Sequence, residues 1–232
     1  MITILHHLGL GDHIMLNGMV RYFAETDTVC IFVQNHHEPS IKFMYRDIID
    51  KVIIKTVNTT NAQEMWGQVE GKVLPLATYK LPTNIWNYIM EGPPTDMVNW
   101  AHSVYIQAGI PPKYMYSKFK VVRDITSEIK PDISDYVFIH DDHKRDMVIN
   151  VDAENVFKIT SEILSKHPNI FDYLTIIENA KEVHCMDSSY AWMINLMGVG
   201  SKDKNFLHID VKGNYNPKMV KTVFGDDLWT YV

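Results

Sequence analysis

The sequence predicts an α/β protein with two halves, each built on a mainly parallel β-sheet. Short apolar runs alternate with helical patterns along the whole chain, which is typical of βαβ units. The apolar runs are continuous, as expected of parallel strands that are covered on both faces. This alternation breaks once, in a Pro-rich stretch from Gly109 to about Pro131, which we interpret as the connection between residues 1–115 and 116–232. The alternative is one larger sheet with an insertion.

Apolar, β-branched runs mark the expected strands, which are Ile2–Leu5, Val29–Val33, Val52–Val57, Val73–Thr78, Tyr136–His140, Val156–Ile159, Glu182–Met186 and Asn205–Ile209. Apolar residues at helical spacing mark the expected helices, which are Ile14–Glu25, Ile41–Asp47, Asn61–Val69, Met97–Ala108, Ser161–Lys166, Phe171–Ala180 and Tyr190–Met197. Because helices lie between most successive strands, the strands of each half are expected to run parallel.

The composition is that of an ordinary globular protein, with 46% apolar and 22% charged residues. Lys and Arg number 22 and Asp and Glu number 28, so the formal charge is −6. This balance argues against non-specific binding to nucleic acid or anionic membranes, which depends on basic patches. No apolar stretch approaches the roughly 20 residues of a membrane-spanning helix, and the N-terminus lacks a signal-peptide pattern. We therefore expect a soluble, cytoplasmic protein in which Cys30 and Cys185 are buried free thiols.

The first candidate site is the turn after the first strand, Leu8–Ile14. Gly9 and Gly11 allow a tight turn and a close approach of a ligand to the backbone, and the following helix presents free N–H groups. The turn lacks the third glycine of a dinucleotide fingerprint, and the second strand does not end in the expected acidic residue. Asp12, at or near the helix N-cap, has two interpretations. It is either a capping carboxylate or a carboxylate at the sheet edge that is directed at a substrate hydroxyl.

The second candidate site is the charged loop that follows the first strand of the second half, His140–Asp146. Its His and Asp residues could be interpreted as a metal cluster, but adjacent residues on one loop rarely converge on one ion. Lys144 and Arg145 suit a phosphate group better, because Arg can bind it through two hydrogen bonds. A solvated charged turn is the structural alternative. Most histidines of the N-terminal half, among them His7 and His13, are interpreted as loop or cleft residues rather than metal ligands.

The third candidate site lies where the strand Glu182–Met186 runs directly into a helix, at Asp187, Ser188 and Ser189. The hydroxyl groups of Ser188 and Ser189 would add donors to the free N–H groups of the helix and form a phosphate cradle. Asp and Ser are also favoured N-cap residues, so helix capping is the alternative. Two phosphate-suited turns in one half, each directly after a strand, favour the phosphate interpretation.

These motifs resemble those of glycosyltransferases with the GT-B fold. The Gly9–Asp12 turn with its amphipathic helix is similar to the first turn of heptosyltransferase-like enzymes, and Val183–Ser189 resembles their nucleotide-sugar turn. The His140–Arg145 loop is loosely similar to the basic motif of α-1,6-fucosyltransferase relatives. The stretch Tyr105–Asp124 resembles the interdomain segment of small viral and bacterial members. The resemblance spans nearly the whole chain in order.

The resemblance implies two Rossmann-like domains that face a cleft, with an acceptor-binding domain at 1–115 and a nucleotide-sugar-binding domain at 116–232. It implies an inverting sugar transfer that needs no metal and no cofactor, from a nucleotide-diphosphate sugar to a glycan hydroxyl. The compartment would be the cytoplasm, that of the host if the protein is viral. The general base would be Asp12. The residues implied in donor binding are His140, Arg145, Glu178, Asp187, Ser188 and Ser189. The residues implied at the glycan acceptor or cleft are His7, Gly9, Gly11 and His13.

Two other functions are compatible with the same residues. A nucleotide-sugar epimerase would consume the donor with no acceptor present. A catalytically silent nucleotide- or sugar-binding module would be stabilised by its ligand but would form no product. In each case the expected partners are small molecules or glycans and not nucleic acid.

Overall fold

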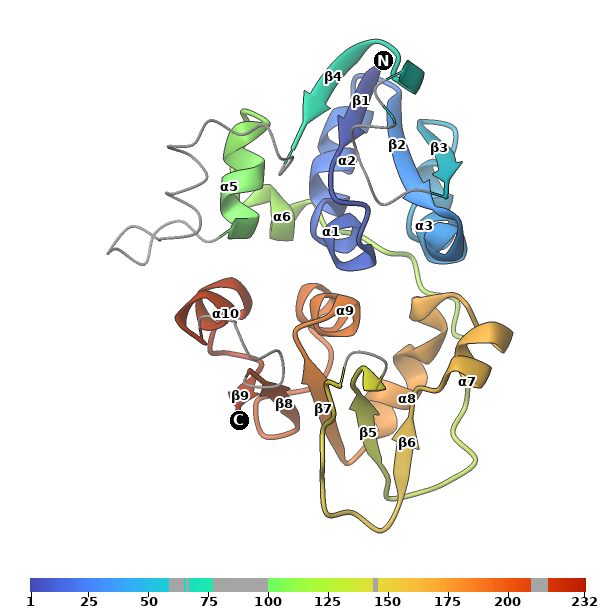
Figure 1. Ribbon diagram of the computed structural model, residues 1–232, viewed down its shortest axis with the longest axis vertical. Helices are drawn as coiled ribbons and strands as arrows, with labels where there is room; N and C mark the ends of the chain where they lie inside the picture. The colour runs from blue at the N-terminus through green and yellow to red at the C-terminus, as the bar shows by residue number, and fades with distance from the viewer. Residues whose placement is uncertain (59–64, 66, 77–99, 144–145, 210–216) are drawn as a thin grey trace. The chain divides into compact units, whose positions relative to one another are not determined.

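The computed structural model of the chain describes residues 1–58, 65, 67–76, 100–143, 146–209 and 217–232 (Figure 1). The described residues divide into two compact units, Met1–Val122 (unit 1) and Arg123–Val232 (unit 2). Each unit has a sheet of its own, with four described strands in unit 1 and five in unit 2. The described strand pairs are all parallel. The predicted α/β class with parallel sheets is therefore confirmed.

Unit 1 has the sheet order β3-β2-β1-β4, so the chain moves outward from β1 to β3 and then crosses back to place β4 beside β1. Every residue of β1 is buried, because this strand lies in the interior of the sheet. The elements of unit 1 are β1 (Ile2–Leu5), α1 (Leu10–Met15), α2 (Asn17–Ala24), β2 (Val29–Gln34), η1 (Asn35–His37), α3 (Glu38–Met44), η2 (Arg46–Ile48), β3 (Val52–Val57), β4 (Lys72–Pro75), α5 (Trp100–Gln107) and α6 (Tyr114–Ser117). One cluster of its core contains Leu5, Leu8, Phe32, Val57 and Met65.

The helix predicted over Ile14–Glu25 is in fact two helices, α1 and α2, and a tyrosine from α5 explains the break. The hydroxyl of Tyr105 donates a hydrogen bond to the carbonyl of Met15 (2.8 Å) and accepts one from the N–H of Met19 (3.2 Å). These two backbone groups would otherwise bond to each other in a continuous helix. A side chain inserted into this ladder interrupts the helix.

Unit 2 has the sheet order β6-β5-β7-β8-β9. Its elements are β5 (Val137–His140), β6 (Val156–Lys158), α7 (Ser161–Lys166), η5 (Ile170–Tyr173), α8 (Leu174–Asn179), β7 (Glu182–Met186), α9 (Ser189–Met197), β8 (Asn205–His208), α10 (Pro217–Phe224) and β9 (Thr230–Tyr231). The helix predicted at Phe171–Ala180 begins instead as the 3₁₀ turn η5. The side chain of Asn169 caps this turn by accepting a hydrogen bond from the N–H of Phe171 at 3.2 Å.

Several elements were not predicted from the sequence, namely η1, α6, α10 and β9. Helix α6 has four residues and β9 has two, which is too short for a hydrophobic period to be recognised. The predicted helix Asn61–Val69 lies largely outside the described residues. Helix α3 begins three residues before the predicted Ile41, with Pro39 in its first turn, where a proline is tolerated.

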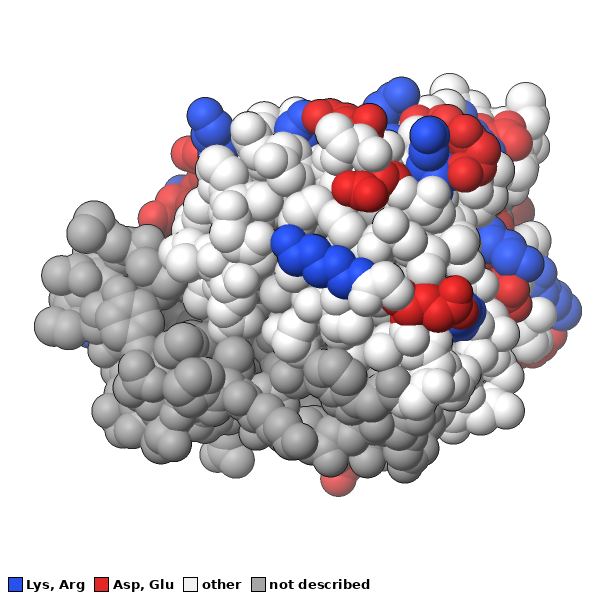
Figure 2. Space-filling view, turned by 90° about the horizontal axis from the view of Figure 1, so that it is seen from above, with Lys and Arg blue, Asp and Glu red and all other residues white. Residues whose placement is uncertain are grey.

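Acidic and basic side chains are interspersed on the face of the molecule that Figure 2 shows, and neither sign dominates it. Within the described part of the chain, no helix has the length and apolar character needed to cross a bilayer.

Candidate functional site

The turn after β1 is shaped by His6 and Leu8 as well as by the predicted glycines. His6 is buried, and its Nδ1 accepts a hydrogen bond from the N–H of Leu8 at 3.2 Å. Leu8 has a φ of 63°, which is uncommon for a residue other than glycine, and its side chain is fully buried in the core. The backbone reverses here, so that Gly9 becomes the N-cap of α1. Gly11, which was predicted in the turn, lies inside α1.

Asp12 lies in the first turn of α1, near the N-cap as predicted, although the N-cap itself is Gly9 and the helix begins at Leu10 rather than at Ile14. A Cβ atom added to Gly9 would stand 2.6 Å from Oδ2 of Asp12, so the carboxylate lies against the backbone of Gly9. The positive end of the helix dipole stabilises a carboxylate in this turn. Asp12 and His7 therefore both lie at the carboxyl edge of the sheet of unit 1, where open parallel sheets bind ligands.

Two neutral histidines are buried beside this turn. His6 and His13 are each 2% exposed, and their rings meet edge to face with centroids 4.3 Å apart. Burial, assisted by the neighbouring His7, lowers the pKa of His6 to about 3. Burial also lowers the pKa of His13, with His6 and His37 acting in the same direction. His13 was predicted to line the cleft, but it is packed inside unit 1.

In unit 2 the structure brings His140 and Ser188 into contact at the carboxyl edge of β5 and β7. Ser188 is the N-cap of α9, and its Oγ accepts a hydrogen bond from the N–H of Ala191 at 3.5 Å. The same Oγ lies 3.1 Å from Nδ1 of His140, whose ring stacks on Tyr190 with centroids 4.1 Å apart. The tautomer of His140 sets the direction of this contact, and when Nδ1 of His140 donates to Oγ, the hydroxyl hydrogen of Ser188 is available for a ligand. Ser188 thus has a capping role, and Ser189 is the first residue of α9.

The loop after β5 is held by a buried aspartate. The side chain of Asp141 is 2% exposed and pairs with Nζ of Lys158 at 2.6 Å. Its Oδ2 also accepts a hydrogen bond from the N–H of Ile149 at 3.0 Å and lies 3.5 Å from Nε2 of His143. Asp141 therefore closes the loop onto β6. Among the described residues, no group of three or more His, Cys, Asp or Glu could hold a metal ion.

Two predicted donor-binding residues do not join the His140–Ser188 contact. Arg145, with its neighbour Lys144, lies outside the described residues. Glu178 lies in α8, four residues before the start of β7, and is therefore at the amino edge of the sheet. Its carboxylate pairs with the guanidinium of Arg123. The chain direction thus places Glu178 at the opposite end of β7 from Asp187 and Ser188.

A chain of polar side chains across β7 and β8 was not predicted. Nε2 of His184 lies 3.1 Å from Oε2 of Glu182, and Nδ1 of His184 lies 2.9 Å from Nε2 of His208. The only signal in the sequence was the presence of His184 and His208 within two runs that were predicted to be buried strands. Such a position usually holds an apolar residue, because a buried polar group must be hydrogen bonded.

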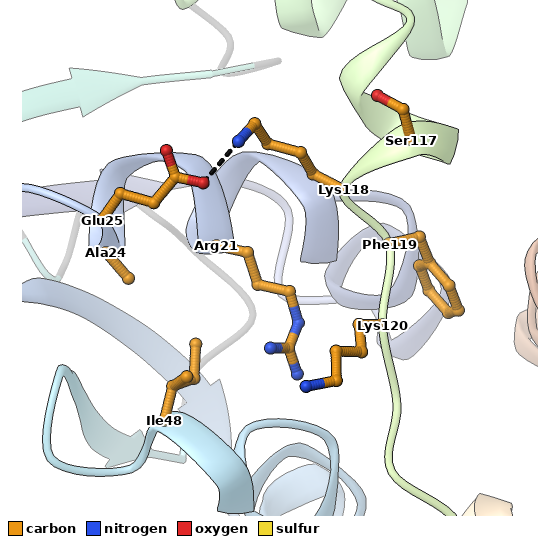
Figure 3. Close-up of a pocket in the computed structure, with 8 residues that line it drawn as sticks. All are labelled: Arg21, Ala24, Glu25, Ile48, Ser117, Lys118, Phe119 and Lys120. Atoms are coloured by element: carbon orange, nitrogen blue, oxygen red, sulfur yellow. Dashed lines mark hydrogen bonds and ion pairs between the residues drawn. The ribbon is translucent and has the colours of Figure 1, made fainter.

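A cavity of about 540 Å³ lies elsewhere in unit 1 (Figure 3). It is lined by Arg21, Ala24, Glu25, Ile48, Ser117, Lys118, Phe119 and Lys120. Its cations are paired: Lys118 with Glu25, and both Arg21 and Lys120 with Asp47. None of the predicted site residues lines this cavity, so we do not include it in the candidate site.

The fold is similar to that of a bacterial glycosyltransferase. One match is the crystal structure of the dodecameric iron-containing heptosyltransferase TibC in complex with ADP-D-beta-D-heptose, with a TM-score of 0.51. A second is that of the dodecameric iron-containing glycosyltransferase TibC from enterotoxigenic E. coli H10407, with a TM-score of 0.53. Each is 10% identical over 94% of this chain. The chain spans 60% and 61% of the lengths of these two structures.

This likeness shows the fold alone, an α/β fold with parallel sheets. No protein-family model matches the sequence, and no curated protein matches it either.

Proposed function

We propose that the protein is a glycosyltransferase that moves a sugar from a nucleotide-diphosphate donor to a hydroxyl group of a glycan. The observation that carries the proposal is the carboxyl edge of unit 2, where Ser188 caps α9 and contacts His140. A half-buried helix N-terminus at the end of a parallel strand suits a diphosphate. The likeness of the fold to TibC, whose structure contains ADP-D-beta-D-heptose, supports a nucleotide sugar as the donor class.

In this proposal, the N–H groups of α9 and the hydroxyls of Ser188 and Ser189 bind the diphosphate, and Arg145 adds positive charge. His140 and Asp187 lie beside them, at the ends of β5 and β7, and would contact the nucleotide sugar. GT-B enzymes, which the sequence resembles, generally need no metal. These groups would therefore neutralise the charge of the leaving diphosphate.

The glycan would bind at the carboxyl edge of unit 1, over the turn that contains His7, Gly9 and Gly11. Asp12 would act as the general base and accept the proton of the attacking hydroxyl group. The oxygen of this hydroxyl would form the new bond to the anomeric carbon while the bond from that carbon to the diphosphate breaks. Attack from the side opposite the leaving group would invert the anomeric configuration.

The variant Asp12→Asn tests the proposed base. Asn has nearly the shape of Asp but cannot accept the proton, so turnover should fall by about 10²–10⁴-fold. Donor affinity and the melting temperature should change little. Near-normal turnover at saturating donor and glycan would contradict the assignment of Asp12. Consumption of the donor without any glycan, in the wild type, would indicate an epimerase instead.

The variant Ser188→Ala tests the proposed donor site. It removes one hydroxyl from the diphosphate site and should weaken binding by about 1 kcal/mol or more, measured by calorimetry with a panel of nucleotide diphosphates. Because Ser188 also caps α9, the stability of the variant must be measured in parallel. Ser165→Ala, at an exposed position on α7, is the matched control. Unchanged affinity in Ser188→Ala would contradict the proposal that the diphosphate binds at the carboxyl edge of unit 2.

A further inference from the structure

Glu182, His184 and His208 form a continuous hydrogen-bonded chain on one face of the sheet of unit 2. Nε2 of His184 lies 3.1 Å from Oε2 of Glu182, and its Nδ1 lies 2.9 Å from Nε2 of His208. His184 is 6% exposed, and its ring stacks on Phe206 with the two planes 9° apart. Both ring nitrogens of His184 are therefore used within the protein, and the ring has little freedom to turn.

The chemistry of the chain determines where each proton lies. A carboxylate can only accept, so Nε2 of His184 carries a hydrogen and donates it to Glu182. In the tautomer in which Nδ1 of His184 accepts, Nε2 of His208 is the donor to it. Nδ1 of His208 is then left with its lone pair. Burial, together with the nearby His184, lowers the pKa of His208 to about 4, which keeps this ring uncharged at neutral pH.

The position of His208 connects this chain to the proposed donor site. His208 is the last residue of β8 and pairs in register with Met186, the last residue of β7. Asp187 and Ser188 follow Met186 directly, at the same edge of the sheet. His208 is half-buried, and its Nδ1 has no hydrogen-bond partner within the described ranges of the chain. An oriented acceptor nitrogen thus lies at the ligand-binding edge.

We propose that Nδ1 of His208 accepts a hydrogen bond from the bound nucleotide sugar, and that Glu182 and His184 hold His208 in the tautomer that makes this possible. The inference rests on the proposed function of unit 2 and adds a specificity-determining residue to it. An uncharged acceptor nitrogen suits an N–H or O–H donor and does not suit a phosphate oxygen. The ligand group is therefore an amino or ring N–H group of the nucleobase or a hydroxyl of the ribose.

Nitrogen-15 NMR of the wild-type protein tests the inference without any substitution. In the free protein, Nε2 of His208 should be protonated and Nδ1 should not. ADP, GDP, CDP and UDP are then added in turn. The nucleotide that binds should shift the Nδ1 resonance of His208, because this atom gains a hydrogen bond. Binding that leaves this resonance unchanged would show that the inference is wrong.

Calorimetry with the same nucleotide tests the contact energetically. His208→Ala should weaken binding by about 5–10-fold, the usual effect of losing one hydrogen bond. His208→Asn should recover most of the affinity, because its Oδ1 can accept from nearly the position of Nδ1. Binding of inorganic pyrophosphate, which has neither base nor sugar, should be the same in all three proteins. Equal nucleotide affinity in His208→Ala and wild type would overturn the inference.

Analogues of the bound nucleotide distinguish the two sources of the hydrogen. If a base analogue without the amino group binds wild type and His208→Ala equally, the nucleobase is the donor. If the 2′-deoxynucleotide binds wild type and His208→Ala with equal affinity, the 2′-hydroxyl of the ribose is the donor.

The variant His184→Phe tests the positioning role of the chain. Phenylalanine keeps the stacking on Phe206 but has no ring nitrogen, so His208 should show a mixture of tautomers by NMR and bind the nucleotide more weakly than wild type. A single unchanged tautomer in this variant would refute the positioning role. If the wild-type protein binds no nucleotide at all, the proposed function fails and this inference falls with it. If it binds one without involving Nδ1, only the inference fails.

Discussion

The carboxylate of Asp12 lies so close to Gly9 that a Cβ atom on Gly9 would stand 2.6 Å from Oδ2 of Asp12. The backbone of Gly9 has a φ of −66° and a ψ of 144°, which any residue can adopt. A Cβ at this position would therefore displace the carboxylate of Asp12 rather than strain the backbone. The two residues were singled out separately in the sequence, and the structure shows that the first makes room for the second.

Gly9→Ala should displace the carboxylate of Asp12 and reduce turnover by about 10-fold or more, since small misplacements of a reacting group are costly. The backbone is not strained by this change, so the loss of stability should stay near 1 kcal/mol, the effect of a poorer N-cap. Gly67→Ala, where an added Cβ meets nothing within 4 Å, is the control. Steady-state kinetics and thermal melting check both expectations. Full activity of Gly9→Ala, alongside an inactive Asp12→Asn, would show that the position of the carboxylate is not critical.

Gly18→Ala should destabilise unit 1 without involving the site. An added Cβ would stand 2.0 Å from the carbonyl oxygen of Tyr114, so α2 and α6 would have to separate. Overpacking of this kind typically costs about 1–3 kcal/mol. Urea denaturation of Gly18→Ala and of the Gly67→Ala control measures the difference. Equal midpoints for the two variants would mean that α6 can move away at little cost.

Asp47 should make unit 1 sensitive to acid. Burial acts to raise the pKa of Asp47, but hydrogen bonds from Arg21 and Lys120 outweigh it and lower the pKa from 3.8 to about 2. The folded state therefore favours the charged form, and this stabilisation is complete above pH 4 and is lost as the pH falls towards 2. Asp47→Asn should cost about 1–2 kcal/mol at neutral pH. Denaturation of both proteins at several pH values tests this. The difference in the free energy of unfolding between wild type and Asp47→Asn should become smaller as the pH falls. A difference that does not change with pH would contradict the stabilising role of the charged Asp47.

Cys30 and Cys185 should not react with a thiol reagent in the folded protein. Both are free and fully buried, which confirms the prediction from the sequence. Burial raises the pKa of each thiol, so little of the reactive thiolate forms. A colorimetric disulfide reagent should therefore detect both thiols only after denaturation. Rapid reaction of either one under native conditions would show that its surroundings open readily.

Much of the fold could be predicted because it depends on local, apolar patterns. β1, β3, β7 and α7 have the predicted bounds, since each is a short run whose composition alone favours its structure. The interruption between α1 and α2 could not be predicted, because it depends on Tyr105, which lies about 90 residues further along the chain. A sequence pattern contains no information about which distant side chain will enter a helix.

The candidate site, like the fold, could be predicted from the sequence only in part. The sequence by itself determined that glycines, hydroxyls and carboxylates follow the ends of parallel strands, and this indicated the carboxyl edges as binding sites. Only the tertiary structure brought Ser188 to His140 and joined His184 to His208. The physical reason is that sheet order and register determine which strand ends are neighbours. Both arise from the packing of the whole unit rather than from any one segment.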